Sequence, residues 1–136
     1  MAMTDKTDKI INAIKIIAIL SGVVFWTIFI SDSPDFNLLG LSECQAIHER
    51  AFPFADLSLA IVLVLSMSPW AYRKNIHRQL SIFAGGQMTF LGVIDLIFNL
   101  QNGVGLSNVA DILFYLICLG CIIFGAVLLV FNTRKP

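Results

Sequence analysis

Four long apolar stretches dominate the pattern of hydrophobic and polar positions along this chain. They cover residues 10–30, 54–72, 80–100 and 109–131, and each holds 19 to 23 residues. A helix needs about 20 apolar residues to cross the ~30 Å hydrocarbon core of a bilayer, whereas a membrane strand would be shorter and would alternate polar with apolar positions. The pattern therefore predicts an all-α, polytopic membrane protein with one domain, residues 1–136, and four transmembrane helices in an antiparallel bundle.

The connection at 31–53 is the only long one between these stretches. It opens with a turn-rich cluster at 31–35, and its second half predicts a short amphipathic helix along the membrane surface. Ser42 and Gln45 have the spacing of a capping box, and Pro53 suits the first turn of the next helix. One face of the short helix would carry Leu41, Cys44, His48 and Ala51.

Basic residues fall almost wholly on one side of this topology, and only Arg50 falls on the other. The positive-inside rule then places both termini in the cytoplasm of a multi-pass membrane protein. The formal net charge is zero and only 13% of the residues are charged, so no global field draws the chain to nucleic acid. The residues on the basic side are Lys6, Lys9, Lys15, Arg73, Lys74, Arg78, Arg134 and Lys135.

Three aspartates lie near the non-cytoplasmic ends of the predicted helices. Carboxylates inside an apolar span are costly and usually face a bundle interior, a partner or a water-filled cavity. Asp56 and Asp111 occupy first helical turns, where capping alone would explain an anion. Asp95 lies near the C-terminal end of its helix, where the helix dipole disfavours an anion. It therefore indicates either a lined cavity or a polar network that joins helices.

We expect these carboxylates to converge on an outward-facing polar pocket. Asn99 and Asn102 follow Asp95 at i+4 and i+7 on the same helical face, and carboxylates with amide partners suit a small cationic, amine-bearing or amphipathic ligand. Tyr115 would add a hydroxyl, and Arg50 would neutralise one carboxylate. The predicted ligand-binding residues are Asp95, Asp56, Asp111, Asn99, Asn102, Tyr115 and Arg50.

Cysteine and histidine positions suggest two further kinds of chemistry. Cys118 and Cys121 form a CxxC, which resembles the motif of the vitamin K epoxide reductase family of four-helix membrane enzymes. That family also needs two cysteines in an outer loop, where this chain has only Cys44. Cys44 and His48 at i, i+4 could begin a zinc site, but loop histidines more often face solvent. We expect no metal, no cofactor and no catalytic residue.

Two segments resemble a signature of small bacterial four-helix membrane proteins. They are FPFADL at 52–57 and DLIFNLQNG at 95–103, and the resemblance implies a bacterial inner membrane but no activity. The layout is also similar in architecture to sterol-isomerase-like (EXPERA) bundles, in which intramembrane carboxylates contact an amphipathic ligand.

Three classes of function follow from the sequence. The first is a binding module with a carboxylate-lined pocket. The second is an accessory subunit of a homo-oligomer or larger membrane complex, in which the same polar groups would join helices. The third is an enzyme, either a thiol oxidoreductase or an isomerase, although no nucleotide-binding, zinc-protease or serine-hydrolase motif is found. The lipid bilayer is the expected partner in every case.

Overall fold

The computed structural model describes residues 2–31, 39–106 and 109–133. Within these ranges the chain is all-α, as predicted, and contains no strand. The predicted turns at 32–35 and the basic residues at 134–135 lie outside the described part, as does the side chain of Lys6. The helices are α1 (Ala2–Ser31), α2 (Glu43–Glu49), α3 (Pro53–Met67), α4 (Pro69–Arg73), α5 (His77–Gln101) and α6 (Val109–Thr133).

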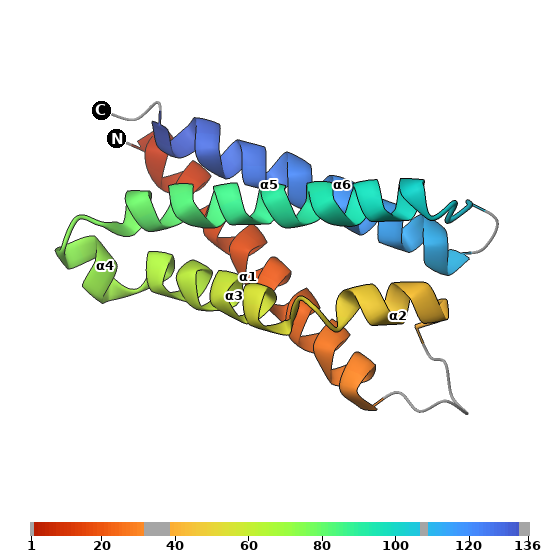
Figure 1. Ribbon diagram of the computed structural model, residues 1–136. Coiled ribbons are helices and arrows are strands. Elements are labelled where there is room, and N and C mark those ends of the chain that lie inside the picture. Colours follow the sequence, from red (N-terminus) through yellow and green to blue (C-terminus); the bar gives the residue numbers. More distant parts are fainter. Residues whose placement is uncertain (1, 32–38, 107–108, 134–136) are drawn as a thin grey trace.

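Three of these helices, α1, α5 and α6, are long and apolar enough to cross a membrane. The prediction of a multi-pass membrane protein is therefore confirmed at this level. The bent pair of α2 and α3 is also apolar enough when taken together, with an angle of 51° between the two helices. The predicted short helix is present as α2 and runs beside the end of α5 (Figure 1).

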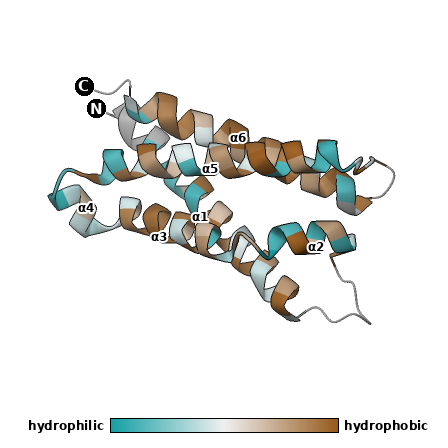
Figure 2. Cartoon of the chain, in the orientation of Figure 1, coloured by the Kyte–Doolittle hydropathy of each residue, from teal (hydrophilic) through white to brown (hydrophobic). Residues whose placement is uncertain are grey.

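The helices run back and forth between two chemically different ends. Figure 1 shows the start of α1, the α4–α5 turn and the end of α6 at one end, and α2 with the α5–α6 connection at the other. Brown apolar segments fill the middle of the long helices, and teal polar residues gather toward the ends (Figure 2). We call the end with Arg73, Lys74 and Arg78 the basic end, and the end toward Asp56 and Asp95 the carboxylate end.

The predicted helix at 54–72 is wrong in its last turns, because the chain breaks at Ser68. Proline has no N–H to donate and disfavours a helical conformation at the residue before it. Ser68 accordingly adopts an extended conformation, with φ −72° and ψ 145°. Its hydroxyl accepts a hydrogen bond of 3.1 Å from the Ala71 N–H and so caps α4.

The start of α2 matches the sequence prediction, but its buried face does not. Ser42 accepts from the Gln45 N–H, and the Gln45 side chain accepts from the Ser42 N–H, which completes the predicted capping box. Pro53 lies in the first turn of α3, as expected. Cys44, however, is exposed, and Gln45 is buried in its place. The helix is therefore rotated from the predicted amphipathic face.

The tightest packing lies between α5 and α6. A Cβ added at Gly92 would lie 2.8 Å from the Cys118 carbonyl oxygen, and one at Gly85 would lie 2.8 Å from the Gly125 carbonyl oxygen. The two backbones are thus in contact, as expected where small residues let membrane helices approach. Gly86 and Gly120 are equally small, but a Cβ added at either would meet nothing within 4 Å.

Gly125→Ala should destabilise the fold. Its Cβ would meet the Gly85 carbonyl oxygen at 2.7 Å and the Thr89 backbone nitrogen at 2.8 Å, and overpacking of this kind costs roughly 1–3 kcal/mol. We expect a lower midpoint of thermal unfolding in detergent. Gly120→Ala, five residues earlier on α6, is the matched control and should leave the midpoint unchanged or slightly raised. Equal midpoints for the two variants would contradict the close approach.

Candidate functional site

Asp95 is held by a histidine from the short helix α2. The Nε2 atom of His48 lies 3.1 Å from Oδ1 of Asp95. The imidazole ring stacks on Phe98, with ring centroids 3.7 Å apart and planes inclined by 10°, and its other neighbour is Phe52 at 4.8 Å. Because Asp95 and Phe98 are three residues apart on α5, they share a face that grips one ring. These contacts dock α2 on α5.

Asp56 is held by an indole from α1. The Trp26 Nε1–H donates a hydrogen bond of 2.9 Å to Oδ2 of Asp56, in the first turn of α3. Trp26 belongs to an aromatic group with Phe25 and Phe29, whose rings lie 5.4 and 5.2 Å from its own. The carboxylate is therefore a structural link between α1 and α3 as well as a candidate ligand group.

Glu49 joins these two aspartates, although it was not among the predicted ligand-binding residues. It lies at the end of α2, half-buried, within electrostatic range of both Asp95 and Asp56. Among the described residues, no hydrogen-bond or ion-pair partner is found for its side chain. The signal that could have found it is its position directly after His48 on a helix that must pack on the bundle.

The other predicted ligand residues lie around this group or serve different contacts. Asn99 is buried on α5, and Asp111 is buried in the first turn of α6. Asn102 caps the end of α5, accepts a 3.6 Å contact from the Cys44 thiol and is exposed. Tyr115 donates its proton to the Val104 carbonyl at 2.8 Å, and Arg50 is exposed at the end of α2. The described side-chain partner of Asp95 is thus His48 and not Arg50.

The two cysteines of the CxxC pack against α5. Both are free thiols, and Cys118 is buried. A Cβ added at Gly92 would have the Cys118 carbonyl oxygen and the Cys121 Cβ as its nearest atoms. Both thiols lie within electrostatic range of Asp95, so they border the carboxylates. Small, apolar packing explains their positions.

At the basic end, the sequence analysis missed a buried lysine. Lys15 is only 3% exposed and donates hydrogen bonds of 2.9 Å to Ser66 Oγ and 2.8 Å to Ser81 Oγ. It therefore ties α1 to α3 and α5 inside the bundle. The signal was available, because Lys15 lies inside the apolar stretch 10–30 and meets the criterion that singled out the aspartates.

Comparison of the chain with protein-family models, with curated proteins and with solved structures found no match. The resemblances drawn from the sequence therefore stay predictions.

Trp26→Phe should lower the midpoint of thermal unfolding, because it removes the hydrogen-bond donor of a half-buried carboxylate. Leaving a buried group without its partner costs roughly 1–3 kcal/mol. The loss should be smaller in an Asp56→Asn background, which can be measured as a double-mutant cycle. Trp70→Phe, at an exposed position near the basic end, is the control and should change little. Additive effects of Trp26→Phe and Asp56→Asn would contradict the link.

Proposed function

We propose that this chain is a membrane-embedded binding protein for a small organic amine, which it holds between α2, α3 and α5. One observation carries the proposal: the side chain of Glu49 lies within electrostatic range of Asp56 and Asp95, and no hydrogen-bond or ion-pair partner for that side chain is found among the described residues. Three carboxylates from three helices thus share one region. Their described polar partners are one imidazole and one indole.

A cation would relieve the repulsion in this group. Like charges near one another in a region of low dielectric raise the energy of the fold, and an ammonium group would compensate two or more carboxylates at once. An amine also brings N–H donors, and charge-assisted hydrogen bonds to carboxylates are about twice as strong as neutral ones. Glu49, with no donor to it, is the first group that such a ligand would engage.

An amine fits better than a metal ion. Among the described residues, no three His, Cys, Asp or Glu side chains come close enough together to share one ion. An organic cation can span separated carboxylates. The rings of Phe52 and Phe98 beside His48 offer apolar surface for its hydrocarbon part, and aromatic faces attract cations. These surroundings favour an amine that carries some hydrocarbon.

The short helix α2 supplies a way to regulate access. It is docked on α5 through the His48–Asp95 contact, the His48–Phe98 stack and the Cys44–Asn102 contact. An ammonium group that binds Asp95 would compete with His48 for the same carboxylate. Binding and the position of α2 are therefore coupled under this proposal.

The proposal is tested by titrating the purified protein in detergent with 1,4-diaminobutane and with phenethylamine. Binding to the folded state should raise the midpoint of thermal unfolding in a saturable way, beyond the effect of sodium chloride at equal ionic strength. Glu49→Gln should weaken binding and raise the half-saturation concentration about tenfold, which corresponds to roughly 1.4 kcal/mol of binding free energy.

Glu43→Gln is the matched control, because Glu43 lies at the exposed start of the same helix. It should change the half-saturation concentration less than about twofold, as expected for an exposed charge. Equal responses of the two variants, or the same stabilisation by sodium chloride, would refute an amine site at Glu49.

A further inference from the structure

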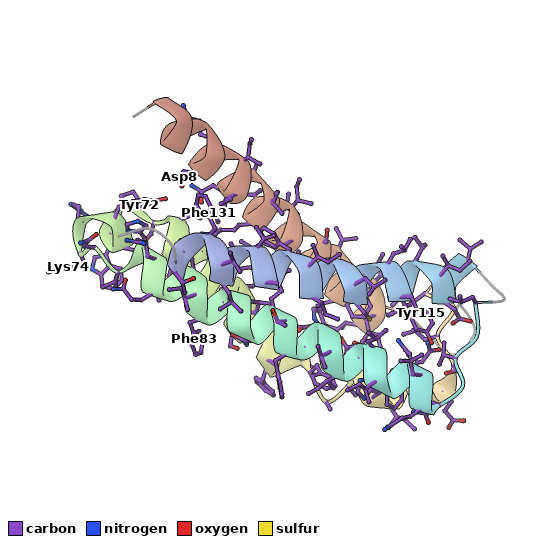
Figure 3. The ribbon with its side chains drawn as sticks, turned by 90° about the horizontal axis from the view of Figure 1, so that it is seen from above. Asp8, Tyr72, Lys74, Phe83, Tyr115 and Phe131 are labelled. Carbon is purple, nitrogen blue, oxygen red and sulfur yellow. The ribbon has the colours of Figure 1, made fainter. Side chains whose placement is uncertain are left out.

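The basic end contains a hollow that has no role in the proposed amine site. It has a volume of about 50 Å³. A single water needs roughly 10–15 Å³ measured in this way, so the hollow has room for a group of a few heavy atoms. Asp8, Tyr72 and Phe131, from three different helices, lie together around it (Figure 3). The polar side chains that line it include Lys15, Arg78, His77, Asn12 and Ser81.

Lys15 is fixed in place as a donor toward this hollow. Ser66 and Ser81 each donate their own proton to a backbone carbonyl, at 2.7 and 2.8 Å, so that their oxygens are oriented to accept from the ammonium group. An ammonium has three N–H donors. The two serines take two of them, and the third has no acceptor among the described residues.

Tyr72 offers a second donor. Its hydroxyl accepts a 3.5 Å contact from the Asn12 side-chain amide, while its ring stacks on His77 with centroids 4.3 Å apart. No acceptor for the Tyr72 proton is found in the described part of the chain. The hydroxyl proton is therefore available to a group inside the hollow.

The charge around the hollow is positive. Lys15 and Arg78 are basic side chains in its lining, and His77 adds a positive charge when it is protonated. Asp8 is the acidic residue in the lining, and it lies within electrostatic range of Lys15. Arg78 is held by a 2.9 Å hydrogen bond from its Nη2 to the Asn132 carbonyl oxygen. Two fixed cations therefore face one carboxylate.

We infer that this hollow is a binding site for a single phosphate-sized oxyanion, with Lys15 as its central donor. An oxyanion would accept from the third N–H of Lys15 and from the Tyr72 hydroxyl, and Arg78 would add its positive charge. Basic pockets between membrane helices are a recurrent means of binding lipid phosphates. The same chemistry would serve the headgroup of an anionic lipid or a free phosphate ion.

The first arm of the test uses free phosphate. The protein in detergent is titrated with sodium phosphate against sodium chloride of equal ionic strength, and the midpoint of thermal unfolding is measured. Phosphate should raise the midpoint in a saturable way. Lys15→Met keeps an unbranched apolar stem without the ammonium group, and it should raise the half-saturation concentration at least about tenfold, as expected for the loss of a buried charge-assisted donor. Lys74→Met, at an exposed position of the same end, should change it less than about twofold.

The second arm uses lipid. Protein in phosphatidylcholine nanodiscs with and without phosphatidic acid is released and examined by native mass spectrometry. Retention of phosphatidic acid by the wild type and by Lys74→Met, but not by Lys15→Met, would identify a lipid headgroup as the source of the anion. Stabilisation by free phosphate without lipid retention would identify a free ion. The absence of both effects would overturn the inference.

A second variant keeps the test decisive if Lys15→Met does not fold. Tyr72→Phe removes one hydroxyl and preserves the ring that stacks on His77. It should weaken anion binding by about three- to tenfold, as expected for one hydrogen bond. Unchanged binding by Tyr72→Phe would exclude this hollow as the site. Glu49→Gln, at the other end of the bundle, should not alter phosphate binding, which separates this site from the proposed amine site.

Discussion

The close approach of α5 and α6 is the contact on which the rest of the molecule is built. Lipid gives little drive for helices to associate, so they depend on close packing and on polar links between them. Gly85, Gly92 and Gly125 let the two backbones touch, and this rigid pair offers the surface against which the other helices pack. α3 lies along α5, and α1 is joined to the bundle through the side chains of Lys15 and Trp26.

Polar side-chain contacts join the remaining helices to the pair of α5 and α6 and to one another. Lys15 joins α1 to α3 and α5 near the basic end, Trp26 joins α1 to Asp56, and His48 joins α2 to Asp95. Each places an ionisable group in the interior with only part of its hydrogen-bonding capacity used. The same side chains that assemble the bundle thus form the two candidate binding sites.

Much of the fold could be predicted from the sequence, because apolar stretches of spanning length leave few alternatives to helices. The face that each helix buries could not be predicted, because α5 and α6 are apolar on several sides and more than one rotation about the helix axis is compatible with their sequences. Gly86 and Gly120 are as small as Gly85 and Gly125 but point away from the contact. The proline after Ser68 indicated a helix break there, but the continuous apolar stretch 54–72 led to the prediction of one unbroken helix. Lys15 was signalled by its place inside the apolar stretch 10–30. Its serine partners, and the approach of Glu49 to the aspartates, depended on how α1 and α2 dock, which no local pattern specifies.

The separation of acidic and basic side chains between the two ends has an electrical consequence. Moving one elementary charge across a membrane potential of 100 mV changes its electrostatic energy by about 2.3 kcal/mol. With the cations of Arg73, Lys74 and Arg78 gathered at one end, the molecule is polarised along its length in that field. The field therefore favours the orientation in which the cations face the negative compartment.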